Sequence, residues 1–117
     1  MGLFSKIIDY FRTPNINLEY ERFQAIPDAV LLDVREAEEY AVKHLPGSQN
    51  LPLSALTKES AAALIRYPDT PVFVYCLAGP RSKRAKAALK SFGYVNINEM
   101  GGIRDYQGPV ESGAPDR

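Results

Sequence analysis

Short apolar runs alternate with amphipathic segments along most of this chain, a pattern typical of an α/β protein. The runs that predict buried strands are residues 30–34, 49–53, 72–75 and 95–97. The segments that predict helices are residues 36–42, 54–67 and 80–92, the second ended by Pro68 and the third by Gly93. Strands joined through helices favour right-handed crossovers. We therefore expect a mainly parallel central sheet of about five strands with helices on both faces.

The first residues carry a separate helical pattern. Apolar side chains recur at helical spacing through residues 3–11, and Thr13 followed by Pro14 would end such a helix. We therefore divide the chain into an N-terminal amphipathic helical extension at residues 1–14 and a single domain at residues 15–117. Packing of the extension on its own domain is the favoured interpretation, ahead of docking on a membrane or a partner protein.

Composition and charge narrow the classes of function. The length of 117 residues, 45% of them hydrophobic, fits one compact domain. The 14 basic and 14 acidic residues balance, which argues against a nucleic-acid binder. We find neither the ~20 consecutive apolar residues of a membrane span nor a secretory signal, so we expect a cytoplasmic protein without a membrane partner. Cys76 is the one cysteine, which excludes an intramolecular disulfide and suits a reducing compartment.

The candidate chemistry centres on Cys76, which follows the strand predicted at residues 72–75. Ligands gather at the carboxyl ends of parallel strands. Gly79 allows a tight turn and Pro80 begins the next helix, so main-chain N–H groups and the positive end of the helix dipole should favour the thiolate. Residues 70–98 contain no acid and five cations: Arg81, Lys83, Arg84, Lys86 and Lys90. We predict a reactive thiol in a cationic field; the alternative is a cysteine that only packs in the core.

Several further stretches share an order and spacing with one known family. They are Leu31–Glu36, Glu39–Tyr40, His44–Leu53, Val72–Cys76, Gly79–Ser82, Gly101–Ile103 and Gly108–Pro109. On these stretches the chain, from about Asn17 to Val110, resembles the single-domain rhodanese family. The resemblance implies a rhodanese-like α/β fold for the domain at residues 15–117.

The resemblance also implies a sulfurtransferase. A donor such as thiosulfate would pass its sulfane sulfur to Cys76, and the resulting persulfide would give that sulfur to a thiol or to cyanide. Cys76 would be the catalytic nucleophile and carrier, and no metal or organic cofactor would be needed. The cradle for the persulfide and the donor would be Leu77, Ala78, Gly79, Pro80, Arg81 and Ser82, with Arg81 holding the anionic donor.

Other residues carry a supporting or an open role. The resemblance implies that Asp33 and Arg35 brace the loop that follows Cys76, although a purely structural ion pair is equally compatible with the sequence. Tyr106 stands where tryptophan is common, and it would either wall the site or pack the C-terminal segment. Leu77 stands where relatives often carry a basic or polar residue, which suggests a bulkier or less polar donor than free thiosulfate. His44 is the one histidine, but a thiolate needs no base, so a Cys-His dyad is disfavoured.

Three alternative functions stay open. The chain could be a persulfide carrier for a specific protein, with the basic segment 81–90 and the N-terminal extension as docking surfaces. It could be a regulatory rhodanese-like binding module, although such modules usually lack the cysteine. A cysteine-dependent phosphatase or arsenate reductase is the remote alternative. Those enzymes carry one residue more between Cys and Arg than the four between Cys76 and Arg81, and this narrower loop suits sulfur.

Overall fold

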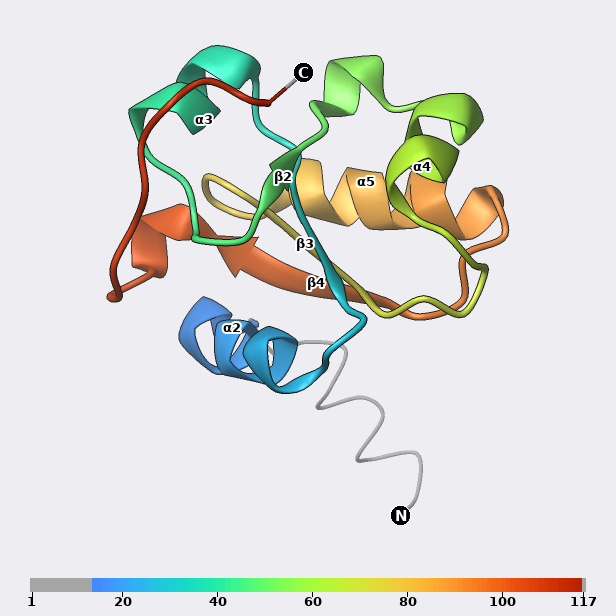
Figure 1. The fold of residues 1–117 in the computed structure, drawn as a ribbon, viewed down its shortest axis with the longest axis horizontal. Helices are drawn as coiled ribbons and strands as arrows, with labels where there is room; N and C mark the ends of the chain where they lie inside the picture. The colour runs from blue at the N-terminus through green and yellow to red at the C-terminus, as the bar shows by residue number, and fades with distance from the viewer. Residues whose placement is uncertain (1–13, 117) are drawn as a thin grey trace.

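The computed structural model describes residues 14–116 (Figure 1). The helical extension expected at residues 1–14 therefore lies outside the described residues, apart from its last residue. The helices are α2 (Ile16–Ala25), α3 (Ala37–Val42), α4 (Lys58–Leu64) and α5 (Pro80–Ser91). The strands are β1 (Val30–Asp33), β2 (Gln49–Asn50), β3 (Val72–Cys76) and β4 (Ile97–Gly102), and two 3-10 turns are η1 (Leu53–Ala55) and η2 (Ile103–Asp105). None of the helices within residues 14–116 has the length and hydropathy needed to cross a bilayer.

The sheet of the described residues is wholly parallel, in the order β2-β1-β3-β4. The sheet has four strands within residues 14–116, one fewer than the about five expected, and these four correspond to the four apolar runs named from the sequence. Each of the four strands lies in or next to one of the predicted apolar runs. All five residues of β3 are buried, since this strand has neighbours on both edges and helices over both faces. The parallel order brings the carboxyl ends of all four strands to one edge.

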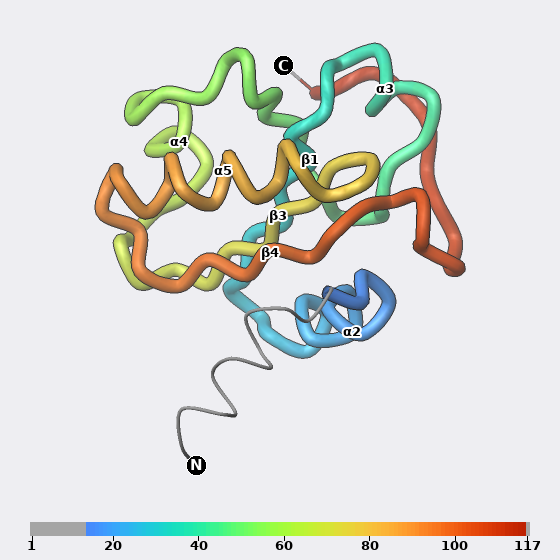
Figure 2. Tube along the Cα trace, turned by 180° about the vertical axis from the view of Figure 1, so that it is seen from behind, coloured from blue at the N-terminus to red at the C-terminus, as the bar shows by residue number. Residues whose placement is uncertain are grey.

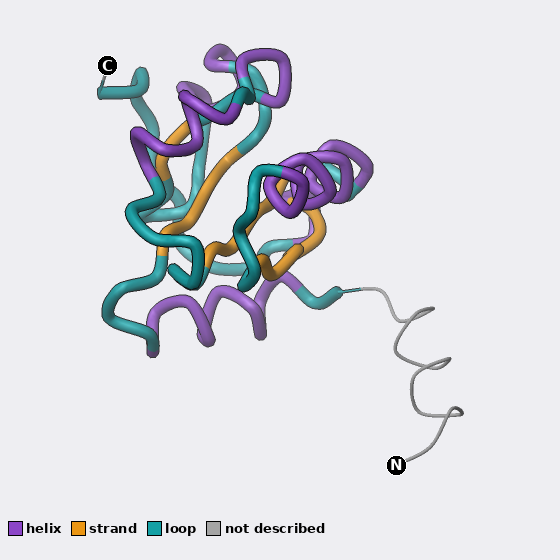
Figure 3. The backbone as a smooth tube through the Cα atoms, turned by 90° about the vertical axis from the view of Figure 1, so that its right-hand side faces the viewer, coloured by secondary structure: helices purple, strands orange, loops and turns teal. Residues whose placement is uncertain are grey.

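Helix α2, which the sequence analysis did not identify, covers one face of the sheet alone (Figures 1 and 3). Asn15 caps its start, the side-chain oxygen accepting from the N–H of Asn17 at 3.0 Å. Ile16, Tyr20 and Phe23 follow at helical spacing and pack on the sheet. The buried cluster on this face is Ile16, Tyr20, Leu31, Leu45, Phe73, Tyr75, Met100 and Ile103.

Helices α4 and α5 cover the opposite face, so the prediction of helices on both faces is confirmed (Figure 2). Ala61 and Ile65 from the α4 segment and Ala85 and Leu89 from α5 are buried against β3 in a second apolar cluster. The helix predicted at residues 54–67 is shorter than expected. It starts only after Thr57, whose hydroxyl accepts from the backbone N–H three residues on, and it ends where Ile65 turns to extended backbone.

Strand β4 begins later than predicted and extends through a glycine pair, Gly101 and Gly102. A Cβ atom on Gly102 would collide with the carbonyl of Leu77, so glycine there allows the strand to run beside the loop that follows Cys76. The pairing of β3 and β4 shifts register between Val74 and Cys76. The end of β4 thus forms one wall of the candidate site.

Candidate active site

Cys76 is the last residue of β3, and a glycine turn caps its thiol. The Sγ atom accepts a hydrogen bond from the backbone N–H of Gly79 at 3.0 Å and lies 3.5 Å from the hydroxyl oxygen of Ser82. Gly79 has φ +121°, which favours glycine, and it is the residue from which α5 starts. Cys76 is only 1% exposed and also belongs to the apolar cluster beneath α5. The thiol therefore lies at the boundary between the core and a polar turn.

The loop between Cys76 and α5 is fastened to β4 and η2. The carbonyl of Leu77 accepts from the N–H of Arg104 at 3.1 Å and lies directly over Gly102. Leu77 and Ala78 are themselves exposed, with Leu77 at 44% of its surface. Pro80 has no N–H group, so it adds no donor to the cradle. The backbone of the loop is thus held in place while its apolar side chains face solvent.

Arg81 is paired with an acid from another element. Its two terminal nitrogens donate to the two carboxylate oxygens of Glu39 on α3, at 2.6 and 3.0 Å. The hydrogen bond from Arg81 lowers the pKa of Glu39 to about 2, so the carboxylate stays ionised at neutral pH. This role of Glu39 was not predicted from the sequence, although Glu39 lies in one of the stretches shared with the rhodanese family. The pair closes the loop and carries no net charge.

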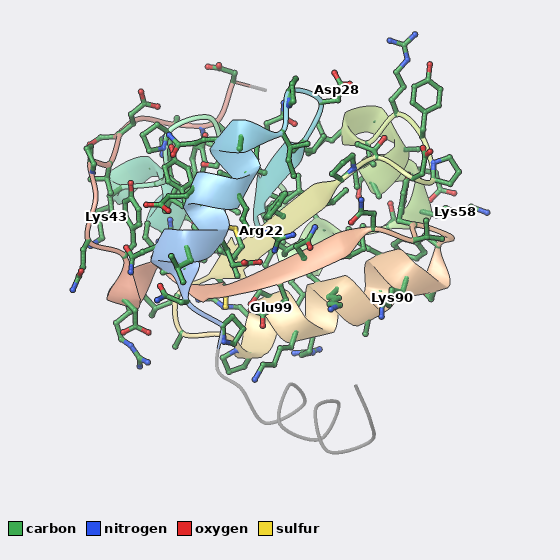
Figure 4. The ribbon with its side chains drawn as sticks, turned by 90° about the horizontal axis from the view of Figure 1, so that it is seen from below. Arg22, Asp28, Lys43, Lys58, Lys90 and Glu99 are labelled. Carbon is green, nitrogen blue, oxygen red and sulfur yellow. The ribbon has the colours of Figure 1, made fainter. Side chains whose placement is uncertain are left out.

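A second acid reaches the site through Ser82. The hydroxyl of Ser82 lies 2.6 Å from Oε2 of Glu99 and 2.8 Å from the carbonyl of Gly79, and the carboxylate is the stronger acceptor for its one proton. The N–H of Gly101 donates to the same carboxylate oxygen at 2.6 Å. Figure 4 shows Glu99 on β4 beside α5. Residues 70–98 contain no acid, and Glu99 is the next position in the sequence, so its contact with Ser82 was not predicted.

Most of the remaining cations of α5 lie at the protein surface. Lys83, Arg84 and Lys90 are exposed and Lys86 is half-buried. None of these four side chains forms an ion pair within residues 14–116. Figure 4 shows Lys90 on the part of the helix remote from Glu99. The exposed cations of α5 thus face solvent, whereas the acids Glu39 and Glu99 bond to residues in the first turn of the helix.

Asp33 and Arg35 form a buried ion pair at the end of β1. Nη2 of Arg35 lies 2.6 Å from Oδ2 of Asp33, and the side chains are 4% and 0% exposed. The same nitrogen donates to the carbonyl of Lys43 at 2.7 Å, just beyond α3, and the side-chain amide of Asn50 donates to both backbone carbonyls of the pair. The pair therefore ties β1 to β2 and α3. Arg35 thus contacts the end of α3, the helix that carries Glu39.

Tyr106 and His44, the two aromatic residues weighed as site residues from the sequence, both pack against other aromatic rings. The ring of Tyr106 meets that of Tyr20 on α2 edge-on, with centroids 5.5 Å apart, which is the packing alternative that the sequence left open. Nδ1 of His44 lies 2.8 Å from the carbonyl of Tyr40, and the two rings stack at 3.7 Å. Tyr106 thus packs against the apolar cluster that contains Tyr20, and His44 stacks on Tyr40.

Comparison with known proteins identifies relatives over most of the chain. The model of the rhodanese-like domain matches residues 18–108. The chain is 38% identical over 82 residues to thiosulfate sulfurtransferase PspE of Escherichia coli, covering 70% of this chain and 78% of that protein. It is 33% identical to the adenylyltransferase and sulfurtransferase uba4 of Ogataea parapolymorpha over 81% of this chain, which spans only 24% of that longer protein.

A solved structure described as a rhodanese with anions from E. coli superposes with a TM-score of 0.67 and 35% identity. The superposition covers 73% of this chain and 99% of the chain in that structure. The glycine turn that caps the thiol at the end of β3 thus lies within the 18–108 stretch that the family model matches, and the protein belongs to the rhodanese-like domain family.

Proposed function

We propose that the protein is a sulfurtransferase that carries a sulfane sulfur on Cys76. The observation that carries this proposal is the hydrogen bond from the Gly79 N–H to Sγ at 3.0 Å, at the start of a helix and at the end of the central strand. An N–H group and a helix N-terminus aimed at sulfur both stabilise its anionic form, which is the nucleophile and also the form of a persulfide. A cysteine that served only to fill the core would need neither feature.

The two half-reactions balance without a metal or an oxidant. In the first, the Cys76 thiolate attacks the outer sulfur of thiosulfate or a related donor; a new S–S bond forms, the old one breaks, and its electron pair leaves with sulfite. In the second, an acceptor thiolate or cyanide attacks the outer sulfur of the persulfide, and the electron pair of the breaking bond returns to Cys76. The loop's N–H groups would stabilise the charge on sulfur in both steps.

Intact-mass measurement tests the proposal directly. The protein is incubated with thiosulfate, an organic thiosulfonate or a small persulfide, freed of excess donor and weighed. We expect a gain of one sulfur atom that cyanide removes as thiocyanate. The variant Cys76→Ser preserves the shape of the side chain and should gain nothing. Failure of every donor to add sulfur to the wild-type protein would overturn the proposal.

A second candidate function is that of a persulfide carrier for one protein acceptor. The observation that favours it is an exposed apolar residue, Leu77, beside a helix whose solvent face is cationic, a surface suited to an acidic protein partner. A carrier would load sulfur normally but release it slowly to cyanide and to small thiols. An enzyme for small acceptors would release it rapidly to at least one of them. Single-turnover release from the loaded protein separates the two functions.

A further inference from the structure

Two acids govern the charge that a sulfur donor meets at Cys76. Arg81, in the first turn of α5, is the cation nearest to Cys76 in the sequence, and both terminal nitrogens of its guanidinium donate to Glu39. Glu99, held by the hydroxyl of Ser82 and the N–H of Gly101, places a carboxylate one hydrogen bond beyond the hydroxyl that lies 3.5 Å from Sγ. An anion that reaches Sγ therefore meets a neutral ion pair and a negative charge instead of a free cation.

The rim of the loop is apolar where it is most accessible. Leu77 follows Cys76 directly and is 44% exposed, and Ala78 beside it is exposed as well. Burial of such side chains under a bound molecule is favourable only when that molecule offers apolar surface. A small inorganic anion offers none. An organic donor can cover Leu77 while presenting its sulfur to the thiol.

The exposed cations of α5 do not change which charges a donor meets close to Cys76. Lys83 and Arg84 point to solvent, and charges exposed in this way attract all anions at long range through a field that salt screens. Such a field raises the rate of encounter with anions in general. Selection between donors needs groups close to the sulfur. The candidates are Leu77 next to Cys76, Ser82 with its partner Glu99, and the Arg81–Glu39 pair at the start of α5.

We propose that the Cys76 loop selects organic sulfane-sulfur donors that carry at most one negative charge near the sulfur, in preference to the thiosulfate dianion. This inference rests on the proposed function and specifies its donor. With an organic thiosulfonate, the Cys76 thiolate attacks the terminal sulfur, the bond to the sulfonyl sulfur breaks, and its electron pair leaves on a sulfinate. With an organic persulfide the leaving group is a thiolate. Both reactions conserve charge and need no further reactant.

The test compares two donors that differ in charge and apolar surface but transfer sulfur in the same way. Loading of Cys76 by thiosulfate and by methanethiosulfonate is followed by quenched intact mass, and each second-order rate constant is divided by the rate with free 2-mercaptoethanol. We expect the wild-type protein to favour methanethiosulfonate about tenfold on this scale. Leu77→Lys should raise loading by thiosulfate about tenfold and change that by methanethiosulfonate far less, since a cation attracts a dianion twice as strongly as a monoanion.

Two further variants serve as controls. Leu77→Gln removes the apolar surface without adding charge. It should therefore slow the loading of Cys76 by methanethiosulfonate and leave the rate of loading by thiosulfate unchanged. Ala87→Lys adds a cation on the exposed part of α5 and should alter the donor preference little. The inference is overturned if the wild-type protein prefers thiosulfate, or if Ala87→Lys matches Leu77→Lys; in either case the sulfurtransferase proposal stands. Absence of loading from both donors and from a small persulfide would overturn the sulfurtransferase proposal, and the donor preference with it.

Discussion

At the scale of single residues, acids that lie far from Cys76 in the sequence set the charge around it. Glu39 is 42 positions from the arginine it binds, and Glu99 is 17 positions from Ser82. Both contacts are charge-assisted hydrogen bonds, which are shorter and stronger than neutral ones. The loop that follows Cys76 is therefore less cationic than the composition of its own segment indicates.

The pair of Glu39 and Arg81 predicts a pH-dependent contribution to stability. Because the pKa of Glu39 falls from 4.5 to about 2 in the folded protein, its contribution is complete above pH 4.5 and is lost as the pH falls toward 2. Both side chains are one-third exposed, so we expect the pair to contribute at most about 1 kcal/mol to the free energy of unfolding.

Urea denaturation of the wild-type protein and of Glu39→Gln at a series of pH values checks this prediction. The difference in unfolding free energy should be constant near neutrality and shrink between pH 4.5 and about 2. Glu59→Gln, which removes an exposed carboxylate on α4, is the matched control. A difference for Glu39→Gln that does not change over this range would contradict the assignment.

At the scale of elements, the site depends on the meeting of β3, α5 and the end of β4. The turn at Gly79 joins β3 to α5 over a very short distance in the chain, and β4 then runs alongside with a glycine where the loop carbonyl approaches. The backbone of Gly102 is itself extended, so steric fit, and not a positive φ, requires glycine there.

Gly102→Ala should therefore displace the Cys76 loop. The added methyl group collides with the carbonyl of Leu77, which cannot move without breaking its hydrogen bond from Arg104. We expect a loss of about 1–3 kcal/mol in the free energy of unfolding and slower sulfur loading of Cys76. Gly113→Ala is the comparison, because a Cβ atom at Gly113 meets nothing within 4 Å; its positive φ of +128° makes alanine costly for stability there, but sulfur loading should stay unchanged. Equal loading rates in the wild-type protein and Gly102→Ala would refute the role given to this contact.

At the scale of the whole molecule, the sheet separates two apolar clusters, and a buried ion pair lies at the carboxyl end of β1. Asp33 and Arg35 connect β1 with β2 through Asn50 and with α3 through the carbonyl of Lys43. A buried pair of this kind costs desolvation, yet loss of one partner leaves an uncompensated charge in the interior.

Arg35→Met should consequently destabilise the protein by about 3–5 kcal/mol in urea denaturation, because Asp33 is fully buried. The double variant Asp33→Asn with Arg35→Met removes the stranded charge and should recover part of that loss. Arg22→Met breaks an exposed pair with Glu19 and should cost less than about 1 kcal/mol. A loss for Arg35→Met as small as that for Arg22→Met would show that the buried pair is not structurally important.

The sequence by itself determined the parts of this protein that neighbouring residues encode. The continuous apolar run before Cys76 predicted the central strand, and the Gly79–Pro80 turn predicted the helix behind the thiol. The helix end at Gly93, with φ +105°, was predicted in the same way. Hydrophobic period and turn chemistry act over a few residues, so one sequence suffices to recognise them. Helix α2 was missed although its cap at Asn15 was visible.

Only the tertiary structure decided which side chains surround the thiol. Strand order and crossovers bring Glu39 to Arg81 and Glu99 to Ser82, and local sequence has no information on either pairing. The same holds for Tyr106, whose ring lies on α2. The nucleophile and its turn could therefore be predicted from the sequence, whereas the electrostatics that choose its donor could not, because charge acts through space between residues that only the fold brings together.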